Sequence, residues 1–208
     1  MITQRLFAGV AWTSVLLMSG CGGKILYPHY YALEIPTVKS AAEAGPRMPI
    51  TVAVRRFEGP SYLRQGRIVY RPARAEIGFY EYHRWVSDPA EMVTSAVMDS
   101  LRASHLFSFV NRYDGQEHHD CIMSGRLEQL EEVDSAEGVR VVVKLSADLT
   151  DSRTGAIVWA GEDAETLAVD TRNVDSVVAE MSHAVEKSID GLVASLRQYL
   201  PANSQVVR

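Results

Sequence analysis

A strict alternation of residue types between Gly138 and Leu149 constrains this chain more than any other feature. Every second position in this stretch carries an apolar side chain, namely Val139, Val141, Val143, Leu145, Ala147 and Leu149. Successive side chains of a β-strand point to opposite faces of the sheet. The pattern therefore predicts a strand with one buried face and one largely solvated face, which is typical of an antiparallel sheet.

The segments on either side of this strand predict its two neighbours. Cys121–Glu132 is expected to form the strand before it, joined through an acidic, glycine-containing link at Glu131–Gly138. The run Asp151–Gly155 is rich in turn residues, and Ala156–Ala168 follows it as a third strand. We therefore expect a three-stranded antiparallel meander in the second half of the chain.

A first helix is predicted after the aromatic middle of the chain. Asp88 can cap its first turn, Pro89 suits the first helical position, and Glu91 completes a capping box. The apolar residues that follow at steps of four are Val93, Val97 and Leu101. They form one stripe that should lie on a sheet. We expect this helix to end near Ser104.

A second, longer helix is predicted from about Asn173 to Tyr199. Apolar residues recur there at steps of three and four, namely at Val174, Val178, Met181, Val185, Ile189, Leu192 and Leu196. Such a helix is roughly 40 Å long at about 1.5 Å per residue. That length exceeds the width of a sheet of four or five strands, at about 4.8 Å per strand. Its end therefore either projects toward a neighbour or packs on the core throughout, and Pro201 is expected to stop it.

The first half of the chain predicts further short strands. They are expected at Tyr27–Ile35, Ile50–Arg56, Gly66–Arg71, Ala75–Tyr82 and Phe107–Val110. Runs of strands interrupted by two helices indicate the α+β class. The predicted architecture is a mixed, mostly antiparallel sheet with two main helices packed on it, plus a small aromatic hairpin.

The N-terminus carries the features of a lipoprotein signal peptide in residues 1–20. Arg5 is followed by a mostly apolar run of about 13 residues, which is too short to span a membrane comfortably. The sequence Met18–Cys21 resembles a bacterial lipobox, in which the cysteine is lipidated. The alternative is an ordinary signal peptide whose cleavage site happens to precede a cysteine. Residues 21–26 then form a lipidated tether, 27–200 a single domain and 201–208 a polar tail.

The net charge and the cysteine content restrict the possible partners and the possible disulfides. The net charge of −5 argues against a nucleic-acid partner, and it becomes −6 once Arg5 leaves with the signal peptide. Only two cysteines are present. If Cys21 carries lipid, Cys121 has no partner in the chain and is expected to be a small buried hydrophobe. A Cys21–Cys121 disulfide is the rival interpretation, since the periplasm permits disulfides.

Motifs of enzymes and metal sites are missing from the sequence. It contains no glycine-rich phosphate loop, no His-Glu-x-x-His and no Gly-x-Ser-x-Gly. His118, His119 and Asp120 stand beside Cys121, but a structural zinc site usually needs a second, spaced ligand pair. We therefore predict no catalytic residues, no metal and no cofactor other than the covalent lipid on Cys21.

Binding residues are predicted by elimination, because a domain without catalytic groups must act by binding a partner. Interfaces concentrate their binding energy in tryptophan, tyrosine and arginine side chains. The chain gathers such residues at Tyr62, Arg64, Arg67, Tyr70, Arg71, Tyr80, Tyr82, Arg84 and Trp85. Core packing alone could explain Trp85 and some of the tyrosines. The arginines are either solvated and paired locally, or they dock an acidic partner or lipid phosphates.

Several fragments of the sequence resemble one known family. A Pro-x-Tyr-Leu segment at Pro60, the strand Arg67–Arg71, and Tyr80-x-x-His-Arg-Trp before a helix are similar to the ABC-type transport auxiliary lipoproteins. Tyr30–Leu33 also resembles the first strand of that family. The resemblance runs from about Cys21 to Leu200. Members are associated with Mce-type lipid transporters of Gram-negative envelopes.

This resemblance implies a non-enzymatic lipoprotein that serves an Mce-type ABC lipid-transport system as an auxiliary or docking component. Gly22 follows the lipidated cysteine where aspartate would retain the protein in the inner membrane, so the periplasmic face of the outer membrane is expected. The implied partners are an Mce-domain protein with its ABC permease and ATPase, and outer-membrane lipid through the acyl anchor. Self-association stays open. The alternatives are a structural or assembly lipoprotein of the outer membrane, or a lipid carrier with its own cavity.

Overall fold

The computed structural model describes residues 26–36, 47–136 and 138–202. Its largest unit is a meander of three long antiparallel strands, β6 (Cys121–Ser135), β7 (Gly138–Asp151) and β8 (Ile157–Ala168). The alternate apolar side chains of β7 are all buried, and the largest of them have no exposed surface. The predicted strand and its two antiparallel neighbours are therefore confirmed.

The other edge of β6 carries two shorter branches of the same sheet. β2 (Met48–Val54) runs parallel to the first residues of β6, and β5 (Phe107–Arg112) runs parallel to β2. β3 (Arg67–Ala73) runs parallel to the end of β6, followed across the sheet by antiparallel β4 (Glu76–Trp85) and parallel β1 (His29–Tyr31). The result is one mixed sheet of eight strands in which most paired residues are antiparallel.

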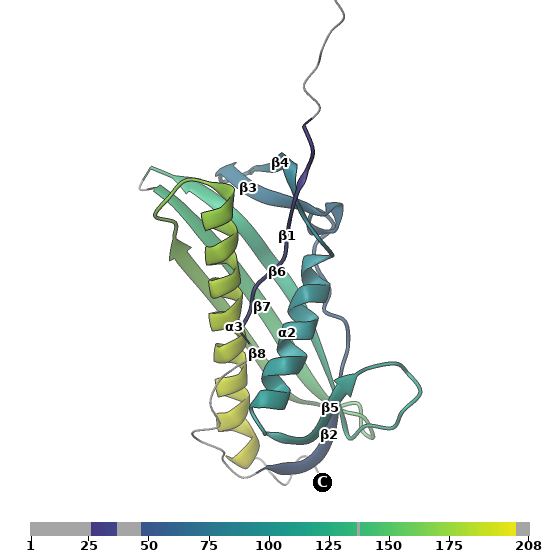
Figure 1. Ribbon diagram of the computed structural model, residues 1–208. Helices are drawn as coiled ribbons and strands as arrows, with labels where there is room; N and C mark the ends of the chain where they lie inside the picture. The colour runs from purple at the N-terminus through teal and green to yellow at the C-terminus, as the bar shows by residue number, and fades with distance from the viewer. Residues whose placement is uncertain (1–25, 37–46, 137, 203–208) are drawn as a thin grey trace, which may run out of the picture.

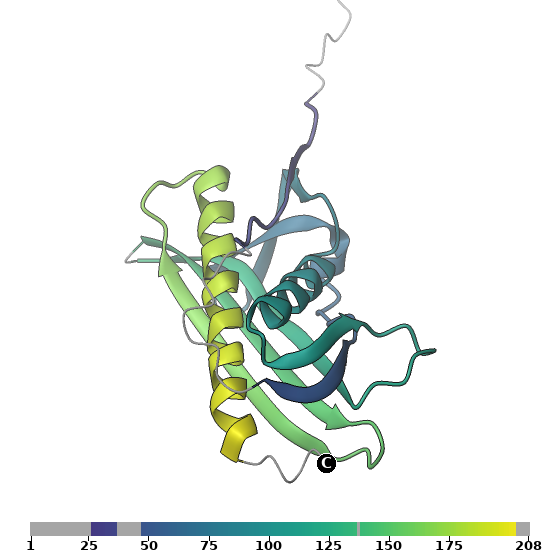
Figure 2. The same ribbon diagram turned by 60° about the horizontal axis from the view of Figure 1, so that its bottom comes forward.

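Both main helices lie on one face of this sheet (Figures 1 and 2). α2 (Pro89–Ala103) begins after Asp88, as predicted, and α3 (Val174–Ala202) packs beside it against β7 and β8. The core lies between these two layers, where Val97 of α2 and Val143 of β7 are both buried. The α+β class, with two helices on a mixed and mostly antiparallel sheet, is confirmed.

Most predicted strand ends differ from the structure by one to four residues, and two of these differences change how a segment is interpreted. Only His29–Tyr31 of the expected strand Tyr27–Ile35 pairs with a neighbour, because β1 has just the end of β4 to pair with. The expected link at Glu131–Gly138 is mostly strand, since β6 runs on to Ser135. Its acidic residues can enter the sheet because arginine and tyrosine side chains satisfy them there, as described below.

The end of α3 also differs from the prediction. The helix continues through Pro201 to Ala202, because a proline in the last turn removes only one donor and leaves the preceding hydrogen bonds in place. Leu192, Leu196 and Leu200 are buried, and Arg197 donates to the carbonyl oxygen of Ser104 at 3.1 Å. α3 therefore packs on the core along its length, and the alternative of a projecting end is wrong.

The expected aromatic hairpin belongs to the main sheet. β3 and β4 do pair as antiparallel neighbours, but β3 also pairs with β6, so the two strands do not form a separate unit. The predicted signal peptide, most of the predicted tether and most of the polar tail lie outside the described residues. None of the helices in residues 26–36, 47–136 and 138–202 is both long and apolar enough to cross a membrane.

Candidate functional site

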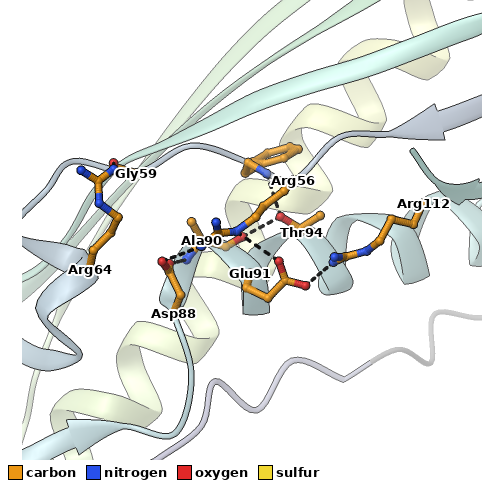
Figure 3. Close-up of polar contacts among 9 residues, drawn as sticks. Arg56, Gly59, Arg64, Asp88, Ala90, Glu91, Thr94 and Arg112 are labelled. Atoms are coloured by element: carbon orange, nitrogen blue, oxygen red, sulfur yellow. Dashed lines mark hydrogen bonds and ion pairs between the residues drawn. The ribbon is translucent and has the colours of Figure 1, made fainter. Parts of the chain in front are cut away.

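The start of α2 is tied to two strands by charged side chains (Figure 3). The backbone N–H of Ala90 donates to Oδ1 of Asp88 at 2.9 Å, which caps the helix. Arg56, just after β2, lies 2.7 Å from Asp88 Oδ2 and 3.3 Å from Glu91 Oε2. Arg112 of β5 pairs with the other carboxylate oxygen of Glu91. The Glu91 carboxylate therefore bridges two arginines and joins α2 to the β2–β5 branch.

The segment after β2 is fixed between α2 and β6. The backbone N–H of Phe57 donates to Thr94 Oγ1 at 2.9 Å, and the Thr94 hydroxyl donates to the Ala90 carbonyl at 2.6 Å. The Phe57 ring packs directly against Gly125 of β6, where a Cβ atom would lie 2.3 Å from the ring. Glycine at position 125 therefore allows this segment to lie close to the sheet.

A cleft of about 320 Å³ opens beside this segment, and we call it the α2 cleft. Its lining residues are Arg56, Phe57, Glu58, Gly59, Arg64, Asp88 and Ala90. Arg64 belongs to the short 3₁₀ helix η1 (Leu63–Gln65), is exposed, and donates to the Gly59 carbonyl at 3.3 Å. A second hollow of about 690 Å³ shares Arg56 and Glu58 and continues over β6, β7 and β8. Together they form a charged surface groove.

The charged side chains of this groove could form ion pairs with a bound molecule. Arg126, in the second hollow, lies 3.2 Å from Glu58, and both side chains are mostly exposed. Exposed ion pairs contribute only about 0–1 kcal/mol to stability. They can therefore exchange their partners for charged groups of a bound molecule at small cost to the fold.

The His118–Cys121 run does not converge on a common point. Asp120 accepts hydrogen bonds from the backbone N–H and the hydroxyl of Thr51, at 2.7 and 2.8 Å. Cys121 is a buried free thiol in β6, and burial, with lesser contributions from Asp151 and Asp120, raises its pKa to about 11. Across the part of the chain that the structure describes, no three His, Cys, Asp or Glu side chains are grouped closely enough to hold a metal.

Five of the nine residues predicted to bind a partner have side chains that contact the sheet or lie in the core. They are Tyr62, Tyr70, Arg71, Tyr80 and Trp85. Arg71 makes two hydrogen bonds of 2.9 Å to the carboxylate of Glu131, which is 1% exposed. The Tyr80 hydroxyl donates to Glu132 at 2.7 Å, and Trp85 is 4% exposed. These contacts give the residues a role in the fold, and their role in binding stays a prediction.

The other four predicted residues reach the surface at two places. Arg64 lines the α2 cleft. Arg67 and Arg84 are directly opposite each other on β3 and β4 and are half-buried, while Tyr82 is exposed. The structure therefore divides the predicted binding region between a cleft and a patch on the β1–β4–β3 branch.

A cluster around Tyr31 was not predicted from the sequence. The Tyr31 hydroxyl donates to Asp175 at the start of α3 at 2.9 Å, and lies 2.9 Å from His83 Nδ1. Burial and the Asp175 carboxylate raise the pKa of Tyr31 to about 12. Burial, and then the stacked ring of His29, lower the pKa of His83. The cluster ties β1 to β4 and α3. Its members are 52 and 144 residues apart, so no local pattern could have revealed it.

The comparison with protein families identifies the family of this chain. The profile of the ABC-type transport auxiliary lipoprotein component matches residues 31–198. The chain belongs to this family. The predicted resemblance is therefore confirmed. The comparison with curated proteins finds no match.

Solved structures share the fold of this auxiliary lipoprotein. Protein XCC0632 from Xanthomonas campestris is 17% identical, with a TM-score of 0.76 over 85% of this chain and 99% of that one. An uncharacterized protein is 13% identical, with a TM-score of 0.64 over 82% and 99%. The hypothetical protein CT253 from Chlamydia trachomatis is 9% identical, with a TM-score of 0.52 over 75% and 100%. At these identities the likeness establishes the fold alone.

One buried carboxylate should give this auxiliary lipoprotein a measurable pH dependence. Burial, and more weakly Asp134, raise the pKa of Glu132. A raised pKa means that the folded state holds the proton more tightly, so the stabilisation is present below the ordinary pKa of about 4.3 and is lost as the pH rises through the folded value. Glu132→Gln keeps a hydrogen-bond acceptor for the Tyr80 hydroxyl. Because glutamine does not ionise, the variant does not lose stability as the pH rises through the pKa of Glu132. We expect the variant to gain stability over the parent between pH 4 and pH 7, measured by urea denaturation. A difference that is constant with pH would contradict this prediction.

Proposed function

We propose that this chain is a non-enzymatic lipoprotein of the outer membrane, anchored through Cys21, that docks a partner of an Mce-type ABC lipid-transport system. The family match over residues 31–198 carries the proposal. The body faces the periplasm, and the residue after the lipidated cysteine, Gly22, supports the outer membrane as its location.

The α2 cleft is the docking site in this proposal, and its occupant is an acidic segment of the Mce-domain partner. The cleft is pre-formed, because Arg56 and Glu91 fix the start of α2 and Gly125 fixes the facing segment. Within the described residues, Arg64 at its rim has a single long hydrogen bond to a backbone carbonyl, so its guanidinium is available to a carboxylate. Bidentate arginine–carboxylate pairs give both affinity and orientation.

Arg64→Glu should therefore weaken capture of the Mce-domain partner by at least tenfold, which corresponds to about 1.4 kcal/mol. The charge reversal repels an acidic segment, while the exposed position spares the fold. Capture is measured by co-purification and titration with the lipidated protein in detergent. The matched control is Arg153→Glu in the exposed turn between β7 and β8, which should bind normally. Equal binding by both variants would remove the α2 cleft from the interface.

One observation disfavours a lipid-carrier site between the two main helices and the sheet, within the part of the chain that the structure describes. The apolar space enclosed by the two helices and the sheet has a volume of about 10 Å³ and is lined by Val97, Leu101, Met123, Trp159, Leu192 and neighbouring side chains. This space has room for about one water molecule, whose centre needs roughly 10–15 Å³ on the same measure, and so it cannot hold an acyl chain. The docking role does not require such a cavity.

A further inference from the structure

Three side chains form a row across the β1–β4–β3 branch. Tyr30 of β1 is the register partner of Arg84 on β4, and Arg84 is the register partner of Arg67 on β3. Register partners on adjacent strands present their side chains on the same face of the sheet. The neighbouring residue Tyr31 points to the opposite face, where it bonds Asp175 of α3. The row therefore lies on the face of the sheet that α3 does not cover.

The two arginines of this row have no counterion among residues 26–36, 47–136 and 138–202. Neither forms an ion pair there, and the Nε atom of Arg84 is buried without a hydrogen-bond partner. Arg56, Arg71, Arg112, Arg126 and Arg172 all reach carboxylates. Like charges directly opposite each other destabilise a sheet, and a buried unpaired donor adds to the cost. An anion bound between the guanidinium groups of Arg67 and Arg84 would offset the repulsion between the two like charges.

The position of the row relative to the anchor indicates which anion is available. Tyr30 follows Cys21 by nine residues, and an extended chain spans about 3.4 Å per residue, so the row lies within roughly 30 Å of the lipidated position. The last residue of the tether and the residues after it expose large apolar or aromatic side chains, since Leu26, Tyr27 and Tyr30 are 52%, 75% and 62% exposed. Tyrosine favours the boundary between lipid headgroups and water. Figure 1 shows β1 entering the body at the end that carries β3 and β4, away from β2 and β5.

We propose that Arg67 and Arg84 bind the phosphate of an anionic phospholipid in the membrane that holds the anchor, with Tyr27 and Tyr30 at the headgroup level. The proposal rests on the proposed lipidation of Cys21 and goes beyond partner docking. Weak intrinsic affinity is sufficient, because a short tether holds the site at an effective headgroup concentration of order millimolar or higher. Two cations near an anionic surface each add attraction. The contact would fix the orientation of the body, with the β2–β5 branch away from the membrane.

The test uses the full mature chain with Cys21→Ser, so that the acyl anchor does not mask the contact. Binding is measured by co-sedimentation with vesicles of phosphatidylglycerol and phosphatidylcholine in equal parts, and with vesicles of phosphatidylcholine alone. We compare Arg67→Gln/Arg84→Gln with the control Arg55→Gln/Arg153→Gln, which removes the same charge elsewhere on the exposed surface. The Arg67→Gln/Arg84→Gln variant should bind anionic vesicles at least tenfold more weakly than the Cys21→Ser chain that carries both arginines. The control variant should bind like that chain.

Other outcomes would overturn the proposal. Absence of binding by the Cys21→Ser chain to anionic vesicles at millimolar lipid would do so. An equal loss in both double variants would also do so, because it would reflect net charge alone. A selective loss of capture of the Mce-domain partner, with vesicle binding retained, would assign the row to a protein interface instead. Thermal unfolding of Arg67→Gln/Arg84→Gln should be no lower than that of the parent, because the substitution removes a like-charge pair. Arg64→Glu tests partner docking independently of this result.

Discussion

Replacing Arg71 with methionine should lower the free energy of unfolding by about 3 kcal/mol, the cost expected when a buried ion pair loses one partner. Arg71 lies on β3 and makes two hydrogen bonds of 2.9 Å to Glu131, whose side chain is 1% exposed. Without the guanidinium, the Glu131 carboxylate must either stay charged with only the 3.3 Å hydrogen bond from Gln129 Nε2, among the described residues, or take up a proton. We place the effect at the lower end of the usual range because the Arg71 side chain keeps 20% of its surface exposed.

Two controls separate the ion pair from the loss of a long side chain. Arg74→Met, in the exposed turn between β3 and β4, should change stability by less than about 0.5 kcal/mol. The double variant Arg71→Met/Glu131→Met should recover most of the lost stability, because replacing both members of a buried pair with apolar residues is often neutral. Urea denaturation measures all three. A double variant as unstable as Arg71→Met would show that packing of the arginine stem, and not the pair, holds β3 to β6.

The elements that could be predicted are those with a local signal. The alternation in β7 needs only its own residues, and the cap at Asp88 with Pro89 after it needs only one turn of chain. The stripe of α3 is likewise visible within the helix. Each of these patterns reports on a neighbourhood of a few residues, and each is confirmed by the structure.

The elements that could not be predicted depend on distant partners. β6 receives β2 and β3 as parallel neighbours on one edge, and a parallel pairing leaves no turn motif between the paired strands. The acidic residues at the end of β6 looked like a loop because charged groups are rarely buried. They are buried because Arg71 and Tyr80 reach them from strands about 50 to 60 residues earlier.

The candidate site could be predicted only in part, because its geometry also depends on residues that are distant in the sequence. Sequence could identify tyrosine and arginine side chains of the type that interfaces use, but not the face on which each would lie. Register shifts in the β3–β4 pairing decide that, and they place Arg67 opposite Arg84. The α2 cleft depends on Gly125, whose missing side chain admits Phe57 from another part of the chain. An isolated glycine in a strand was the only local signal for it.

Changing Cys21 to alanine should abolish the salt-resistant attachment of the protein to the membrane. The family is a lipoprotein family, and Cys21 is the cysteine that follows the signal-like segment. Acyl chains anchor by burying methylene groups at about 0.8 kcal/mol each, and two or more chains are needed for stable attachment. The mature chain is acidic, so its body has little general attraction to anionic lipid, and contacts through Arg67 and Arg84 would be weak and sensitive to salt.

The variant should therefore take up no radioactive fatty acid and should appear in the soluble periplasmic fraction after a high-salt wash. Cys121→Ala is the matched control, since it removes the other cysteine from a buried position in β6. It should keep both the label and the membrane fraction, at a small cost in stability. Absence of the label from the parent itself would favour the rival Cys21–Cys121 disulfide, because a sulfur held in a disulfide cannot carry the lipid. Retention of Cys21→Ala in salt-washed membranes would show that another part of the chain anchors the protein.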